Sequence, residues 1–142
     1  MRNVIQFDGI KFWIDQNVIC CKLNTGFFKN HQWVDIDDIF YNAISILSKG
    51  RYLPILISFG EINNSNSLKT FNVLSNGKLM RTLDLPRVFL VHSSSLKMLL
   101  SLHHNIGHRI SPTKIFKDFN RAIAYCNNEH LVYKNFNKQR LV

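Results

Sequence analysis

Two short stretches decide the fold of this chain: LPILISF at residues 53–59 and RVFLVH at residues 87–92. Their apolar residues are consecutive rather than alternating, which is typical of strands that are buried on both faces of a sheet. Each stretch ends in polar residues and is followed by a segment that can form a helix. Parallel strands need such long connections, so this order predicts an α/β domain with central parallel strands.

The segment before these stretches has the composition of antiparallel strands. Residues 3–8, 10–14 and 18–23 are rich in strand-forming side chains, and residues 15–17 provide a turn between the last two. The chain is therefore expected to open with antiparallel strands.

A helix is predicted next, because apolar residues recur at helical spacing at Ile36, Ile39, Phe40, Ala43 and Leu47. We expect Asp35 or a neighbour to cap its start and Gly50 to end it. Asp37 and Asp38 would lie near the positive end of its dipole.

The second half of the chain continues the alternation. Helices are predicted over residues 67–76 and 78–83, separated by Gly77, and over a segment that Ser93, Ser94 and Ser95 cap. A short strand at residues 113–116 precedes a last helix with Phe119, Ile123 and Cys126 on its buried side. We expect one domain, residues 1–126, with a mixed sheet and about four packing helices, and a partly ordered basic tail, residues 127–142.

Residues 39–50, 52–58 and 112–126 resemble segments of a family of uncharacterised Bacteroidetes proteins. The fold of that family is similar to the STAS domain of anti-anti-sigma factors, and the resemblance spans roughly residues 3 to 126. It implies a STAS-like mixed sheet backed by helices, and a regulatory or ligand-binding role without catalysis.

The resemblance also implies a place for phosphorylation. In STAS regulators a phosphorylatable Ser or Thr follows a central strand, at the start of the next helix, and the matching place here holds Ser65 and Ser67. The free N–H groups and dipole of a helix N-terminus favour a phosphate. The Asp and Gly that accompany the phosphorylated residue in that family are missing here.

Polar side chains follow both apolar stretches. If the two strands are neighbours, one crevice at their carboxyl ends holds Glu61, Ser65, Ser67, His92 and Ser93. We predict a ligand or partner site there. Two alternatives stay open: the same side chains cap loops and helices, or they form a Ser/His/acid hydrolase, for which no nucleophile-elbow motif is present.

Metal and nucleotide chemistry find little support in the sequence. His103, His104 and His108 could suggest a metal site, because residues four apart on a helix can bind one ion. Gly107 is expected to end the helix before His108, so this spacing loses its helical geometry. The six glycines are isolated, so no phosphate-binding loop is present. Adjacent strand residues such as Cys20 and Cys21 point to opposite faces and do not share a metal easily. We predict no cofactor and no metal, and reduced, mostly buried cysteines.

The charge favours anionic partners. The chain has 18 Lys and Arg against 9 Asp and Glu, a net charge of +9. Most basic residues are scattered, and they become denser only in the tail at Lys134, Lys138 and Arg140. The tail is a candidate anion-binding segment, although nucleic-acid binding is not the favoured interpretation.

These observations favour a non-enzymatic regulatory or binding domain that acts through protein–protein contacts or a small ligand, as a homodimer or with a regulatory protein partner. The alternative is an anion- or nucleic-acid-binding protein that uses its basic surface and tail. No stretch approaches the ~20 apolar residues that span a bilayer, and the N-terminus lacks the features of a signal peptide. We expect a cytoplasmic protein without a membrane partner.

Overall fold

The computed structural model describes residues 4–7, 9–30, 33–60, 62–83, 85–106 and 113–128. The strands are β1 (Val4–Phe7), β2 (Ile10–Asp15), β3 (Val18–Leu23), β4 (Ile55–Ser58), β5 (Arg87–Leu90) and β6 (Thr113–Phe116). The helices are α1 (Phe27–Asn30), α2 (Trp33–Ser48), α3 (Asn64–Asn76), α4 (Lys78–Leu83) and α5 (Ser94–Ile106), and a further helix over residues 119–128, here called the C-terminal helix.

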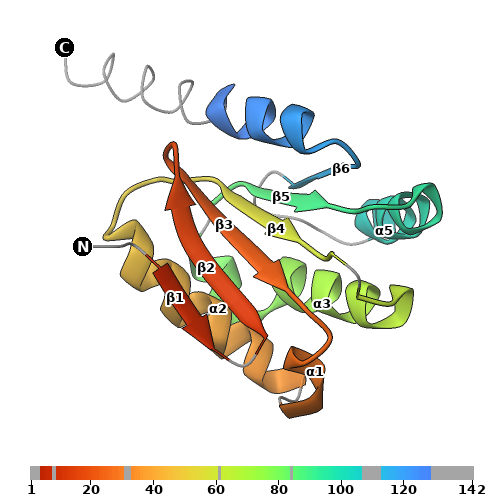
Figure 1. The fold of residues 1–142 in the computed structure, drawn as a ribbon, viewed down its shortest axis with the longest axis horizontal. Coiled ribbons are helices and arrows are strands. Elements are labelled where there is room, and N and C mark those ends of the chain that lie inside the picture. The colour runs from red at the N-terminus through yellow and green to blue at the C-terminus, as the bar shows by residue number, and fades with distance from the viewer. Residues whose placement is uncertain are drawn as a thin grey trace.

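The six strands form one mixed sheet in the order β1-β2-β3-β4-β5-β6 (Figure 1). The first three strands are antiparallel neighbours, and β3, β4, β5 and β6 run parallel to one another. This arrangement confirms the predicted α/β class, with antiparallel strands first and parallel strands after them. About four helices were expected, and the described residues form six.

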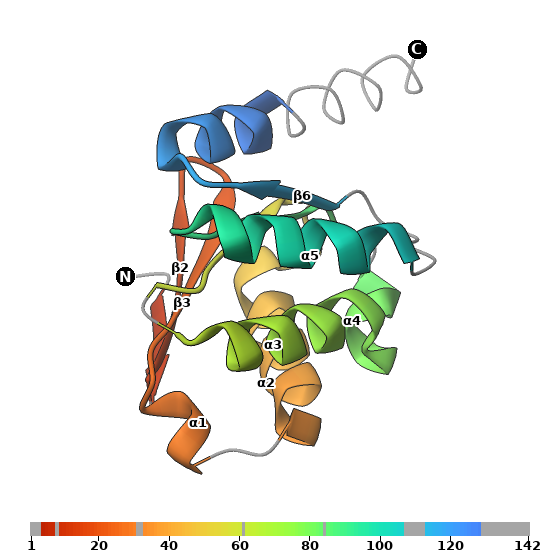
Figure 2. The same ribbon diagram turned by 90° about the vertical axis from the view of Figure 1, so that its right-hand side faces the viewer.

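The five helices described between strands, α1 to α5, cover the same face of the sheet. Figure 2 views the sheet from its edge and shows α1 to α4 on one side of β2 and β3. Connections between parallel strands are almost always right-handed, and the strand order never reverses, so each crossover returns over the same face. We call this the first face. Its core includes Phe12, Ile57 and Phe89 from the sheet, with Phe40, Phe71 and Leu100 from α2, α3 and α5.

The opposite face, here called the second face, has a smaller core. Val18, Cys20, Leu56 and Val88 from β3, β4 and β5 pack there against Ala122 and Cys126 of the C-terminal helix. Phe119 was predicted on the buried side of this helix, but its side chain is 51% exposed. The prediction was wrong for Phe119 alone, since Cys126 is buried and Ile123 is partly buried against the same cluster. Phe119 lies on the same side of the helix as Ala122 and Cys126, but it is the first helical residue and lies beyond their contact with the sheet.

The predicted turn between β2 and β3 is confirmed. Gln16 and Asn17 are the two residues between Asp15 and Val18, which pair with each other. Both have positive φ angles, 51° and 65°, as a two-residue type I′ hairpin requires.

The starts of two helices differ from the predictions. α2 begins at Trp33, so Asp35 lies in its first turn instead of capping it. α3 begins at Asn64, three residues earlier than expected, because the Asn63 side chain accepts a hydrogen bond of 2.7 Å from the Asn66 N–H.

Asp37 caps a different helix from the one that contains it. Its carboxylate accepts hydrogen bonds from the backbone N–H groups of Leu79 at 2.8 Å and Met80 at 3.0 Å, in the first turn of α4. Gly77 lies against the same carboxylate, where a Cβ atom would clash. Asp37 thus fixes α4 to α2 instead of serving only the dipole of α2.

Arg87 joins α4 to the sheet. It is buried, and its guanidinium donates hydrogen bonds to the carbonyls of Met80 and Leu85. A buried guanidinium needs such acceptors, since desolvation of its charge would otherwise be costly.

None of the helices in the described part of the chain is both long enough and apolar enough to cross a membrane.

Replacement of Asp37 tests its role as a cap. We expect Asp37→Ala to lower the free energy of unfolding by about 1–2 kcal/mol, because two N–H groups of α4 lose a charged acceptor. Asp37→Asn keeps an acceptor oxygen and should cost less. Asp38 is the next residue in the chain and its side chain is exposed, so Asp38→Ala is the matched control for the loss of a negative charge. Urea unfolding measures all three variants, and equal stabilities of Asp37→Ala and Asp38→Ala would contradict the assignment.

Candidate ligand-binding site

The predicted site is at the carboxyl ends of β4 and β5. The two strands are parallel neighbours, with Ser58 paired to Leu90, so the condition for that prediction holds. However, ligand crevices at this edge of α/β sheets form where the strand order reverses, and this sheet has no reversal.

The residues predicted for this site serve different local roles. Ser67 is fully buried and its hydroxyl donates to the Ile62 carbonyl at 3.5 Å, whereas Ser65 is exposed in the first turn of α3. The Ser93 hydroxyl accepts a hydrogen bond of 3.2 Å from the Leu96 N–H and caps α5, as the capping alternative predicted. His92 is exposed.

Within the described residues, no hydrogen bond joins the serines of α3 to His92 or Ser93. Glu61 lies outside the described residues, so the site as a whole stays a prediction.

Other predicted residues also lie beyond the described ranges. They are Lys134, Lys138 and Arg140 of the tail, and His108. His103 is half-buried on α5, and the described residues contain no group of three or more His, Cys, Asp or Glu side chains that could hold a metal ion.

A pocket lies on the second face of the sheet, beside the start of the C-terminal helix. Its volume is about 270 Å³, near the lower end of the ~300–1,000 Å³ that small-molecule sites occupy. The lining residues come from β2, β3, β4, β5 and the C-terminal helix: Trp13, Cys20, Cys21, Lys22, Leu56, Ser58, Leu90 and Phe119. Most of the lining is apolar, and Lys22 and Ser58 bring polar groups. Such a lining, with few polar groups, is typical of ligand pockets.

The pocket exists because the C-terminal helix is the one helix, among the residues that the structure describes, that covers the second face. The C-terminal helix packs through Ala122 and Cys126, and the partly buried Trp13 and Leu90 lie at the border of that contact. Phe119 at the start of the helix forms a wall of the pocket while half of its surface stays exposed.

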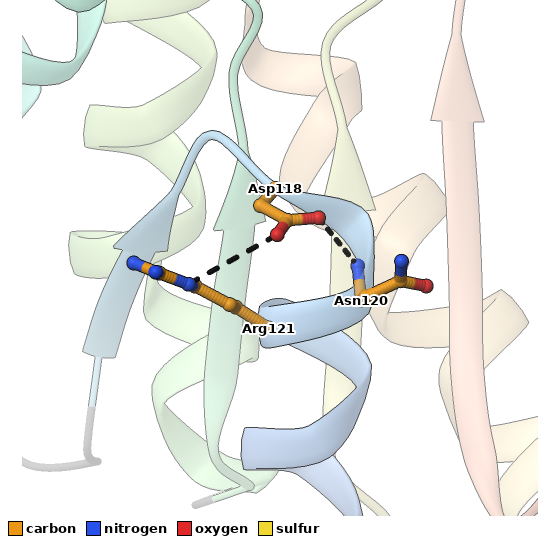
Figure 3. A network of polar contacts seen from close by, with 3 residues as sticks. All are labelled: Asp118, Asn120 and Arg121. Atoms are coloured by element: carbon orange, nitrogen blue, oxygen red, sulfur yellow. Dashed lines mark hydrogen bonds and ion pairs between the residues drawn. The ribbon is translucent and has the colours of Figure 1, made fainter.

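Asp118 holds the start of this helix (Figure 3). Its carboxylate accepts a hydrogen bond of 3.0 Å from the Asn120 N–H, and it lies 4.0 Å from the Arg121 guanidinium. The ion pair is exposed and contributes little, so the cap is the main effect of this carboxylate. It fixes the turn from which Phe119 reaches the pocket.

Cys20 contributes a protonated thiol to the pocket floor. Burial, and secondly the negative charge of Asp15, raise the pKa of Cys20 from 9.0 to about 11. Burial also raises the pKa of Cys21 well above its usual value. Since the thiolate is the nucleophile and the metal ligand, Cys20 acts near neutral pH as an apolar contact.

Comparisons of this chain with models of protein families, with curated proteins and with solved structures found no match. The resemblance to the STAS-like family therefore stays a prediction.

The sequence alone does not predict the pocket, since the lining residues are scattered from Trp13 to Phe119. One signal was available. β3 is buried at every position except Lys22, and a lone charge in such a strand marks an opening in the packing around it.

Alkaline titration tests the state of Cys20. A raised folded-state pKa means that the unfolded chain loses its thiol proton first, so stability is lost as pH rises from 9 to about 11. We expect Cys20→Ala to lose less of its free energy of unfolding over this range than the wild type. Comparing the pH slopes removes any constant cost of the substitution. Equal slopes from urea unfolding at pH 8 to 11 would contradict the assignment.

Proposed function

We propose that this protein is a non-enzymatic binding domain that holds a small ligand with an apolar body in the pocket on the second face. The observation that carries the proposal is the pocket itself, which has a mostly apolar lining on the sheet face that, in the described chain, the C-terminal helix alone covers. Binding of an apolar ligand in a concave site is favourable, because it removes accessible apolar surface from water.

The lining supports selective binding. Leu56 and Leu90 provide aliphatic contacts, and Trp13 and Phe119 provide aromatic walls that can pack against a planar or extended apolar group. Ser58 adds one hydroxyl that can donate or accept a hydrogen bond. Ligand orientation would then depend on this hydroxyl and on Lys22.

The regulatory part of the expected function would depend on Ser65. Of the two serines that the resemblance implies as phosphorylation sites, Ser65 is exposed, while Ser67 is buried and hydrogen-bonded. A kinase would reach Ser65 without unfolding α3. The negative charge of a phosphate in the first turn of a helix interacts favourably with the positive end of the helix dipole, so α3 would tolerate the phosphate.

Binding of N-phenyl-1-naphthylamine, a neutral apolar dye whose emission rises in apolar surroundings, tests the pocket. The chain has two tryptophans, so a Trp33→Phe background leaves Trp13 as the single donor for energy transfer to the dye. We expect saturable binding with quenching of Trp13, because Trp13 lines the pocket.

Two variants locate the dye. Ser58→Phe should abolish binding by filling the pocket, and Phe119→Ala should weaken it several-fold by removing a wall. Leu102 is 57% exposed on α5 on the first-face side, so Leu102→Ala is the matched control for loss of an exposed apolar side chain. The proposal would be overturned if the dye showed no saturable binding, or if Ser58→Phe left its affinity unchanged.

A further inference from the structure

The basic residues beside the pocket are arranged in register with its apolar floor. Strand pairing places residues of the second face in two adjacent rows. The first row is largely apolar and consists of Val4, Trp13, Cys20, Leu56 and Val88. The second row is polar from β1 to β4 and consists of Gln6, Lys11, Lys22, Ser58 and Leu90. A molecule lying across this face would contact an apolar strip and a basic strip together.

Lys11 and Lys22 are direct cross-strand partners on this face. Like charges opposite one another in an antiparallel pair are unfavourable, and both side chains are exposed. The Lys11 ammonium lies 5.2 Å from the centroid of the Trp13 ring, so its charge is directed to a residue of the pocket wall. Lys22 itself lines the pocket.

Within the described part of the chain, the negative charges near the pocket do not neutralise this pair. Asp15 is on the same face of β2, but Trp13 lies between it and Lys11 along the strand. Asp15 pairs with Val18, so it is at the end of β3 that is away from Lys22. Asp118 is engaged with the N–H of Asn120 and the guanidinium of Arg121. Of the described residues that line the pocket, Lys22 is the one that carries a charge.

We infer that the ligand is an amphipathic anion, whose apolar body occupies the pocket and whose carboxylate, sulfonate or phosphate is held between Lys22 and Lys11. The Ser58 hydroxyl, paired to Lys22 across β3 and β4, is placed to donate a hydrogen bond to the same group. This inference rests on the proposed function, since it assigns the chemical class of ligand to that pocket.

A pair of dyes with the same ring system tests the inference. 8-Anilino-1-naphthalenesulfonate carries a sulfonate that N-phenyl-1-naphthylamine lacks. We expect the anionic dye to bind the folded protein more tightly than the neutral one at low salt. Its advantage should shrink as salt rises, because the lysines are exposed and their charges are screened.

Three variants identify the charges involved. Lys22→Ala should weaken binding of the anionic dye about fivefold, and Lys11→Ala combined with it about tenfold or more, with less than about a twofold change for the neutral dye. Lys97 is exposed on α5, which covers the first face, so Lys97→Ala is the control of equal charge and should leave both affinities unchanged. Thermal unfolding of each variant confirms that it is folded.

The outcomes separate the inference from the function beneath it. Suppose that the neutral dye occupies the pocket, but the anionic dye binds no more tightly and Lys22→Ala does not change its affinity. The ligand class is then wrong and the pocket proposal stands. If the anionic dye binds but Ser58→Phe does not displace it, the charge acts elsewhere on the basic surface and the inference fails. If neither dye binds, both proposals fail.

Discussion

The handedness of the connections between parallel strands determines most of this structure. Each of the three crossovers between β3 and β6 moves to the next position in the same direction across the sheet. Because such connections are right-handed, α1 to α5 must all lie on one face. The large core, with its interlocked Phe59, Phe71 and Phe89, forms on that face, and the other face is left to whatever follows β6.

The second face is therefore where this fold has room for a ligand. In sheets whose strand order reverses, helices cover both faces and ligands bind at the carboxyl edge. Here the C-terminal helix covers part of one face, and its contact through Ala122 and Cys126 leaves a hollow beside Phe119. The position of the pocket follows from topology, and its chemical character follows from Lys22, Ser58 and the aromatic walls.

The sequence was most informative about elements whose stability is local. Continuous apolar runs predicted β4 and β5, and helical periodicity predicted α2 and α5, because those patterns reflect burial directly. Features that depend on distant contacts were missed. Asp37 was expected to act on its own helix, but its hydrogen-bond partners lie more than forty residues away, at Leu79 and Met80. The pocket was missed for the same reason, since β2, β3, β4, β5 and the C-terminal helix all contribute to it.

The span of the pocket lining has a thermodynamic consequence. Trp13 and Phe119 lie near opposite ends of the described chain, and the pairing of β3 with β4, between them, joins the most distant residues in the sheet. Unfolding of β2, β3, β4, β5 or the C-terminal helix would open the site, because each of them contributes lining residues. Occupancy is then linked to the global folding equilibrium, and a bound ligand adds RT ln(1 + [L]/Kd) to the stability of the whole domain.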